Sequence, residues 1–430
     1  MKKSILQTTW NSMPGPHDIT RTTLPNGITL LCRPNFSSPS VYLTGYLAAG
    51  SIQDPPQKLG LANFTARSLM RGTQKRSFQQ IYQELETIGA SMGFDANVHT
   101  SSFSARALAE DLSLILDLLS QALRFPLFPE EHILKVRAQL LTGLAMRAQD
   151  TAEMASLEFD RLLFPNHPYG RPEDGFPETI GSIQAGELAA FHGKYYKPNG
   201  MVLVIVGGIA AEAALDLVAA QFGNWQPDPM PEVFDAPPVL PPEKPARSHI
   251  TIPGMSQTDL VMGTLGPART SPDYIPAALG NNILGQFGMM GRIGDVVREK
   301  AGLAYYASTS LNAWMHVGSW EVSAGVNPQN LQKAIDLIIS EISRFVQEPV
   351  SADELSDSQS NFIGRLPLLM ESNGGVGSAL VNIERFNLGL DYYQQYADRV
   401  RNVTTEDVLA AARRYLNPDA MITTSAGVLE

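Results

Sequence analysis

Cysteine is almost absent from this sequence, which has one, Cys32, among 430 residues. A single cysteine cannot form a disulfide within the chain and cannot build a cysteine-based metal site. The seven histidines are also scattered, and no two lie three or four positions apart, the spacing at which two imidazoles on one helix bind zinc. Neither residue type predicts a metal centre in this chain.

Long apolar runs and an excess of positive charge are missing too. No window holds the roughly 18 uninterrupted apolar residues of a membrane-spanning helix, and no apolar segment of signal-peptide length follows Met1. The 32 basic residues are outnumbered by 43 acidic ones, for a net charge of −11. This balance argues against nucleic acid or an anionic membrane as partner. We therefore expect a cytoplasmic protein that contacts neither.

What the sequence does have is the composition of an ordinary globular protein, 44% hydrophobic and 17% charged, in a length that suggests two or more domains. Residues 226–247 contain eight prolines, too many for a helix or a central strand. We interpret them as an extended linker. It separates an N-terminal domain, residues 1–225, from a C-terminal domain, residues 248–430.

The two predicted domains repeat one pattern. Residues 407–421 match residues 187–201, which lie 220 positions earlier, and residues 331–345 match residues 112–125. Repeats of this length are whole domains rather than solenoid units. The predicted fold class is α+β, with two duplicated domains, each a mostly antiparallel β-sheet with helices packed on one face.

An ordered set of short motifs extends over most of the chain. The motifs are Leu24–Gly27, Ala49–Ser51, Gly60–Ala62, Arg71–Thr73, His167–Gly170, Tyr195–Gly207, Arg298–Tyr305 and Val403–Val408. In this set the chain resembles the pitrilysin-type (insulinase-like) zinc metallopeptidases, which include mitochondrial processing peptidase. The resemblance implies that the two domains form a half-clamshell. It also implies that two halves close into a chamber, as a homodimer or as a heterodimer with one active subunit.

The residues at the positions of that family's zinc motif are different in this chain. Active members carry H-x-x-E-H on the helix after the Gly-Leu-Ala segment, and a glutamate further along the chain is the third ligand. The resemblance places these four roles on Asn63, Ala66, Arg67 and a position near Leu144. Asn63 is a poor zinc ligand, Ala66 cannot take a proton, and Arg67 is a fixed cation. We predict no cofactor in this chain and zinc in a partner subunit.

Arg298 and Tyr305 match the arginine and tyrosine with which active relatives contact the substrate carbonyl. Donors aimed at a developing oxyanion stabilise it strongly in an enclosed site. The alternative is structural, with Arg298 a solvated helix residue paired with Asp295 or Glu299, and Tyr305 a core aromatic. Because side chains alternate along a strand, Tyr306 is the competing candidate for the chamber-facing phenol.

Two further segments are candidates for peptide contact. Gly285, Gly288 and Gly291 lie in a glycine-rich loop that lacks the phosphate-binding patterns. It is either a peptide-sensing loop, as in the non-catalytic subunit of processing peptidase, or a helix-terminating turn with packing glycines. Asn97 precedes a strand that active relatives use as an exposed edge for an added substrate strand. Asn97 contacts that peptide or is an ordinary polar residue beside an edge strand.

These features predict the non-catalytic, substrate-binding subunit of a heterodimeric zinc metalloendopeptidase. A homologous H-x-x-E-H subunit would supply the zinc, and peptides or unfolded segments would be cleaved in a closed chamber. The isolated chain would then be inactive. Three alternatives remain open, namely a structural or assembly protein of the same fold, a peptide-binding homodimer without hydrolysis, and an atypical active enzyme.

Overall fold

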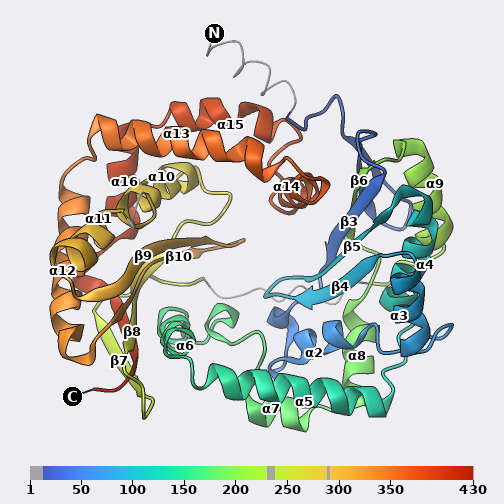
Figure 1. The fold of residues 1–430 in the computed structure, drawn as a ribbon, viewed down its shortest axis with the longest axis horizontal. Helices are drawn as coiled ribbons and strands as arrows, with labels where there is room; N and C mark the ends of the chain where they lie inside the picture. Colours follow the sequence, from blue (N-terminus) through green and yellow to red (C-terminus); the bar gives the residue numbers. More distant parts are fainter. Residues whose placement is uncertain (1–12, 230–237, 288–290, 430) are drawn as a thin grey trace. The chain divides into compact units, whose positions relative to one another are not determined.

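A computed structural model describes residues 13–229, 238–287 and 291–429 (Figure 1). Gly288, one of the candidate loop glycines, lies outside the described residues. The chain forms two compact units, and neither is continuous in sequence. Of the described residues, unit 1 holds 13–144, 172–229 and 367–394, and unit 2 holds 145–171, 238–287, 291–366 and 395–429.

Unit 1 contains a six-stranded sheet in the order β1-β2-β6-β3-β5-β4. The strands are β1 (Thr20–Thr23), β2 (Thr29–Pro34), β3 (Ser40–Leu47), β4 (Ser91–Ala96), β5 (Ser101–Leu108) and β6 (Val202–Gly207). All neighbours are antiparallel except β2 and β6. Strand β4 is an edge strand, with one side of its backbone free of a sheet neighbour.

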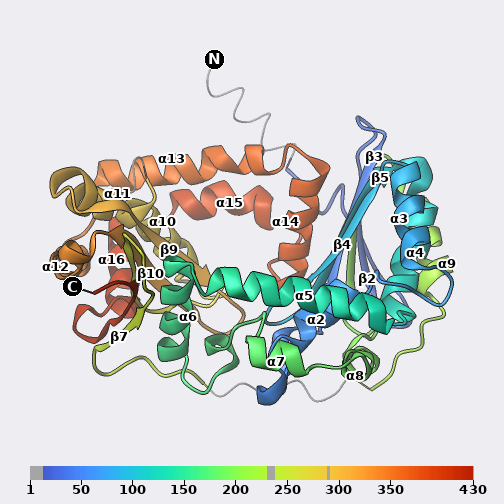
Figure 2. The same ribbon diagram turned by 60° about the horizontal axis from the view of Figure 1, so that its bottom comes forward.

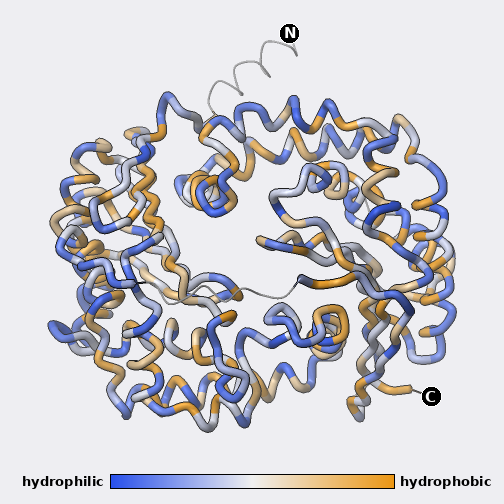
Figure 3. The backbone as a smooth tube through the Cα atoms, turned by 180° about the vertical axis from the view of Figure 1, so that it is seen from behind, coloured by the Kyte–Doolittle hydropathy of each residue, from blue (hydrophilic) through white to orange (hydrophobic). Residues whose placement is uncertain are grey.

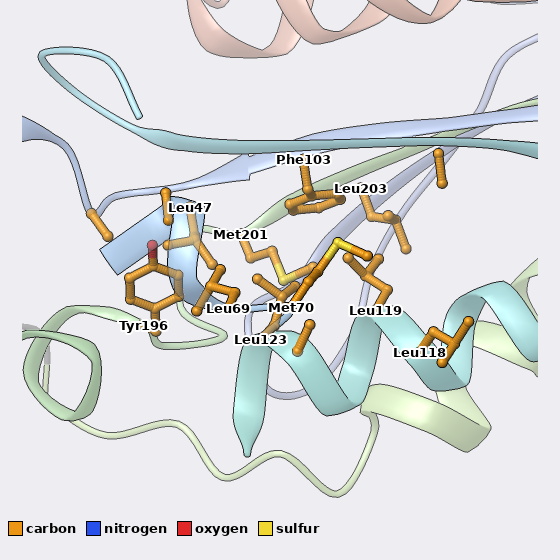
Figure 4. Close-up of a cluster of buried hydrophobic side chains, with 14 of the residues drawn as sticks. Leu47, Leu69, Met70, Phe103, Leu118, Leu119, Leu123, Tyr196, Met201 and Leu203 are labelled. Carbon is orange, nitrogen blue, oxygen red and sulfur yellow. The ribbon is translucent and has the colours of Figure 1, made fainter. Parts of the chain in front are cut away.

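The core of unit 1 lies between one face of this sheet and several helices. The helices of the unit are α2 (Leu61–Ser68), α3 (Phe78–Thr87), α4 (Leu112–Arg124), α5 (Glu130–Arg147), α7 (Pro177–Ser182), α8 (Ala185–Tyr195) and α9 (Ala211–Phe222). Helical spacing of leucines gives α4 one apolar stripe. Leu119 and Leu123 on that stripe share a buried cluster with Phe103 and Leu203 of the sheet (Figure 4).

Unit 2 contains a five-stranded sheet in the order β7-β11-β8-β10-β9. The strands are β7 (Ala246–Thr251), β8 (Thr258–Gly266), β9 (Ala304–Ala313), β10 (Gly318–Val326) and β11 (Ile422–Gly427). Its helices include α10 (Tyr274–Gly285), α11 (Gly291–Gly294), a π-helical segment η5 (Asp295–Lys300), α12 (Leu331–Gln347) and α16 (Thr405–Tyr415). Helix α13 (Ala352–Leu369) and helix α15 (Tyr392–Arg401) follow α12 and precede α16. Trp320 and Phe345 are at the centre of the second core.

The two sheets confirm the duplication. Strands β2, β6, β3, β5 and β4 occupy the same order as β7, β11, β8, β10 and β9, and the parallel pair β2–β6 corresponds to the parallel pair β7–β11. Helices α8 and α16 fall on the repeated segments that ended the two halves of the sequence. The predicted fold class, with mostly antiparallel sheets and packed helices, is confirmed.

One feature of both units was not predicted. Each sheet carries a helix on its second face as well. Helix α14 (Asn373–Arg385), from the C-terminal part of the chain, packs on β3 and β6 of unit 1. There Gly377 lies against Tyr42, whose neighbour Val41 faces the main core. Helix α6 (Thr151–Leu163), from the N-terminal part, packs on β8 and β11 of unit 2, with Phe159 against Gly263.

The exchange of these two helices explains why the compact units differ from the continuous domains 1–225 and 248–430. The chain passes from unit 1 to unit 2 within α5 and returns to unit 1 at residue 172, and it enters unit 1 again within α13. Residues 226–229 and 238–245, from the proline-dense segment, form neither helix nor strand.

Hydrophilic and hydrophobic residues alternate along the long helices (Figure 3). Across the described ranges, no helix has both the length and the apolar character needed to cross a membrane.

Candidate functional site

The helix that corresponds to the zinc-motif helix of the family is α2, and its start is fixed by a buried carboxylate. Asp54 accepts hydrogen bonds from the backbone nitrogens of Gly60, at 2.8 Å, and Ala62, at 2.9 Å. Gly60 has φ +90°, a left-handed conformation that suits glycine. Asp54 therefore satisfies donors that the first turn of α2 leaves without a helical partner.

The four positions of the zinc motif do not fit a zinc ion. Ala66 and Leu144 are buried, at 1% and 3% exposure, in the same apolar core. Asn63 is also buried, and its Oδ1 has no hydrogen-bond partner, while Arg67 is exposed. One amide oxygen, two apolar side chains and a guanidinium are not the anionic or imidazole donors that zinc requires. In the part of the chain that is described, no group of three or more His, Cys, Asp or Glu side chains could hold a metal ion.

A cavity of ≈ 200 Å³ lies at this place in unit 1, and we call it the arginine pocket. Its lining comes from α2, α3, β4 and α5 and comprises Ala66, Arg67, Met70, Arg71, Tyr82, Met92, Gly93, Phe94, Val136, Gln139 and Leu140. Arg67 and Arg71 are four positions apart in the sequence, and both residues line this cavity. The motif position that would hold a metal ligand instead contributes a positive charge.

Tyr305 is exposed because the register of β9 is irregular at this point. In the pairing with β10, Ala304 lies opposite Val326 and Tyr306 lies opposite Gly325, so Tyr305 has no partner residue. Such a bulge redirects side chains and is common next to functional sites. The side chain of Tyr305 is 86% exposed, which excludes the interpretation of Tyr305 as a core aromatic.

Tyr306, the competing phenol, is already engaged. Its hydroxyl donates to Oδ1 of Asp259 on β8 at 2.8 Å. Asp259 is 3% exposed and also accepts hydrogen bonds from Thr151 of α6 and Gln257. Burial, followed by the hydrogen bond to Asp259, raises the pKa of Tyr306 well above its usual value of 10. Among the described residues, no side chain forms such a hydrogen bond with the hydroxyl of Tyr305.

Arg298 lies in η5, the π-helical turn before β9. Its Nη1 is 3.1 Å from Oε1 of Glu299, and its side chain is 33% exposed. Of the two partners expected in the structural alternative, Glu299 is the one that pairs with Arg298. The other, Asp295, pairs with Lys300 at 2.6 Å. Exposed ion pairs of this kind contribute little to stability, and π-helical turns recur at functional sites. The guanidinium can leave Glu299 for a better acceptor at little cost.

The described glycines of the loop have packing reasons. A Cβ on Gly285 would lie 2.4 Å from the backbone nitrogen of Thr309 in β9. Gly291 has φ +63°, and a Cβ there would lie 2.6 Å from the nitrogen of Gly285. Next to it, Arg292 forms a bidentate pair with Glu354, with both N–O distances 2.7 Å. Both glycines are thus required by local packing, as in the helix-terminating interpretation.

Asn97 organises the turn between β4 and β5. Its Oδ1 accepts hydrogen bonds from the backbone nitrogens of His99 and Thr100, both at 3.1 Å, and from Arg385 of α14 at 3.4 Å. The sequence interpretation made the strand after Asn97 the exposed edge. That was wrong, since β5 is paired on both sides and β4, which precedes Asn97, is the edge.

The candidate residues thus fall into two sets. Unit 1 holds Asn63, Ala66, Arg67, Asn97 and Leu144, and unit 2 holds Gly285, Gly291, Arg298 and Tyr305. Sequence reasoning missed Arg71 of the arginine pocket and Asp259 below Tyr306. The spacing of Arg71, four residues after Arg67, was a readable signal, but nothing in the sequence near Asp259 indicated its partners.

Family models match most of this chain. Residues 33–168 match the model described as insulinase (peptidase family M16), and residues 182–362 match the model described as the peptidase M16 inactive domain. A protein described as an uncharacterized zinc protease of Streptomyces coelicolor is 27% identical over 407 residues, which cover 93% of this chain and 87% of the relative. A similarly described protein of Bacillus subtilis is 23% identical, covering 82% of this chain and 85% of its own length.

Solved structures share the fold. A crystal structure of a peptidase M16 inactive domain from Pseudomonas fluorescens has a TM-score of 0.89 and 27% identity, over 96% of this chain and 98% of that one. A protease from Helicobacter pylori has a TM-score of 0.87 at 17% identity, over 97% of this chain and 100% of its own. At that lower identity the likeness shows the fold alone.

Proposed function

Because the chain belongs to the insulinase family of peptidases, family M16, we propose that it is the non-catalytic, substrate-binding subunit of a heterodimeric zinc metalloendopeptidase. A homologous subunit with an intact H-x-x-E-H motif is the partner. It supplies the zinc, the activated water and the general base. Peptides or unfolded segments are the substrates, and they are cleaved in the chamber that the two subunits enclose.

The observation that carries this proposal is the contrast between the two sets of residues. In unit 1 the metal positions hold an amide, two apolar side chains and a cation, none of which can activate water with zinc. In unit 2 the phenol of Tyr305 is exposed on a bulge, and the guanidinium of Arg298 forms a surface ion pair with Glu299. The groups that would act on a substrate are available, whereas those that would hold the metal are absent.

Within the assembled enzyme, Arg298 and Tyr305 hold the carbonyl of the bond that is cleaved. The hydroxyl of Tyr305 and the guanidinium of Arg298 both donate hydrogen bonds to the carbonyl oxygen. As negative charge develops on that oxygen in the transition state, these bonds strengthen, because donors to a charged acceptor bind more tightly than donors to a neutral one. Both residues thus favour the transition state over the bound peptide.

The test is kinetic and uses the complex with the H-x-x-E-H subunit. Tyr305→Phe and Arg298→Ala should each lower kcat/KM by about 10–100-fold, mostly through kcat, since each removes a donor to the developing oxyanion. Lys300→Ala is the control, because it removes a 70%-exposed cation from the same turn. Unchanged kcat/KM in both variants would show that the two residues play no part in cleavage.

A structural or assembly role, or peptide binding without hydrolysis, is the alternative. The ion pair of Arg298 with Glu299 and the packing roles of Gly285 and Gly291 are compatible with it. Co-purification distinguishes the two. Recovery of the chain with an H-x-x-E-H subunit supports the enzyme, and a stable complex that contains no such subunit and cleaves no peptide supports the alternative.

A further inference from the structure

The arginine pocket has an unusual balance of charge for this protein. The chain carries 43 acidic and 32 basic residues, yet the residues that line the pocket include two arginines and no aspartate or glutamate. Arg67 and Arg71 also form no ion pair with any residue in the described ranges. Two uncompensated guanidinium groups in one cavity favour an anionic ligand.

Arg71 is the less exposed of the two arginines. Its guanidinium carbon lies 5.2 Å from the ring centroid of Phe78, within the range of a cation–π contact. Its Nε is buried and has no hydrogen-bond partner. A buried donor without a partner is unfavourable unless a ligand or water satisfies it. Phe78 is not part of the lining of the arginine pocket but, with Glu131, lines a neighbouring cavity, so Arg71 lines both cavities.

The remaining lining indicates the kind of anion. Met70, Met92, Phe94, Val136 and Leu140 add apolar atoms beside the two arginines, while polar atoms make up the larger part of the lining. Such a mixed cavity suits a carboxylate at the end of an aliphatic stem, because the stem contacts the apolar wall while both oxygens accept from the guanidinium fork. Gln139 and Tyr82 add two neutral polar side chains.

The pocket adjoins the free edge of the sheet. Met92, Gly93 and Phe94 belong to β4, the edge strand of unit 1. A Cβ placed on Gly93 would meet no atom within 4 Å, so the face of β4 is open at this point, and among the described strands only β5 pairs with β4. An extended peptide can add to such an edge through backbone hydrogen bonds, and its alternate side chains then reach neighbouring pockets.

We propose that the arginine pocket binds a carboxylate of the peptide substrate, from an aspartate or glutamate side chain or from the peptide's C-terminus. Arg67 and Arg71 both donate to this carboxylate while the peptide backbone lies along β4. The site that would hold the metal in active relatives is thereby a specificity subsite. This inference rests on the proposed function in so far as the ligand is a peptide.

The experiment measures peptide binding by titration calorimetry on the full chain. The probes are an acetylated, amidated peptide of alternating serine and valine with one central glutamate, the same peptide with glutamine in its place, and the glutamine peptide with a free C-terminal carboxylate. At least one of the two carboxylate-bearing peptides should bind about tenfold or more tightly than the fully amidated glutamine peptide. Which one does so identifies the source of the carboxylate.

Variants assign the preference to the pocket. Arg67→Ala, at an exposed position, should remove the preference for the carboxylate, so that the carboxylate-bearing and the amidated glutamine peptides bind with equal affinity. Arg71→Lys should weaken the preference while it keeps the charge, because lysine lacks the planar fork. Arg365→Ala is the control, since it removes an exposed helical arginine outside the pocket and should change neither affinity.

Each outcome decides a different statement. Equal binding of all three peptides, or a preference that survives both Arg67→Ala and Arg71→Lys, overturns the carboxylate subsite and leaves peptide binding in place. If none of the peptides binds, the subsite is overturned, and the proposed role as a subunit is decided separately by the kinetics of the complex. Loss of the preference in Arg67→Ala alone, with Arg365→Ala unaffected, supports the subsite.

Discussion

Replacing Tyr306 and Tyr305 separately with phenylalanine tests which tyrosine is structural and which is available to a substrate. Each change removes a single hydroxyl from neighbouring positions of β9, so the two variants are matched in chemistry. Tyr306→Phe deletes the donor to Asp259, whose carboxylate is 3% exposed. Tyr305→Phe deletes a hydroxyl from a side chain that is 86% exposed.

The expected sizes of the two effects differ clearly. A hydrogen bond to a charged group is worth about 1.5–3 kcal/mol. Because Asp259 keeps its bonds from Thr151 and Gln257, we expect a loss around the lower end of that range, about 1–2 kcal/mol, for Tyr306→Phe. Tyr305→Phe, at an exposed position without such a partner, should stay within about 0.5 kcal/mol of the unaltered protein.

Hydrogen exchange of the backbone amides in β9 and β10 is the appropriate assay, because it reports local opening in a chain that has two compact units. Tyr306→Phe should lower protection there by about 5–30-fold, since about 1.4 kcal/mol corresponds to tenfold. Amides of β3 and β5 in unit 1 should not change. Equal loss of protection in both variants, or a larger loss in Tyr305→Phe, would refute the assignment of roles.

Two further predictions concern stability. Burial lowers the pKa of His192 from 6.5 to about 4, and its Nε2 donates to the carbonyl of Leu123 at 2.9 Å. Neutral His192 stabilises the folded state, and this stabilisation is complete above pH 6.5. As pH falls from 6.5 towards 4, the unfolded chain takes up a proton on His192 more readily than the folded one, so the free energy of unfolding should drop by up to about 3 kcal/mol. Denaturant titrations above and below this window should show a smaller drop in His192→Gln, and an equal drop would contradict the assignment. Gly377→Ala should loosen α14 by about 1–3 kcal/mol, because the new Cβ would lie 2.8 Å from Cδ1 of Tyr42. Gly364→Ala, with no atom within 4 Å of its Cβ, should stabilise α13 by up to about 1 kcal/mol. Hydrogen exchange of the amides in α14 and α13 measures both effects, and a change of protection with the same sign in the two variants would contradict this account.

The duplicated fold was predictable because apolar periodicity and turn residues act locally. The match of residues 407–421 with residues 187–201 gave α8 and α16 as equivalent helices, and the continuous apolar segment 201–206 gave a strand that is buried on both faces. Such burial already implies that something covers the second face. It does not identify the covering element, which is α14, some 170 residues further along the chain.

The exchange of α6 and α14 could not be predicted for a related reason. An amphipathic pattern shows that a helix buries one face, but it does not show which sheet that face contacts. The same limit applies to the edge of the first sheet, since β4 and β5 have similar local patterns and only their pairing distinguishes them.

Prediction of the candidate site was uneven. The loss of metal donors at Asn63, Ala66 and Arg67 was visible in the sequence, because residue type alone decides it. The positions of Tyr305 and Tyr306 depend on a bulge, and strand alternation by itself predicts only that the two differ. The hydrogen bond from Tyr306 to Asp259 is a tertiary contact between β9 and β8, which local sequence does not predict.

The central claim is that this chain contributes substrate binding but no metal chemistry to a zinc peptidase. Metal analysis and a peptidase assay, on the purified chain alone and on its complex with an H-x-x-E-H subunit, test it directly. We predict that the isolated chain binds no stoichiometric zinc and has no turnover, and that the complex has both zinc and chelator-sensitive activity. Stoichiometric zinc with chelator-sensitive turnover in the isolated chain would contradict the claim.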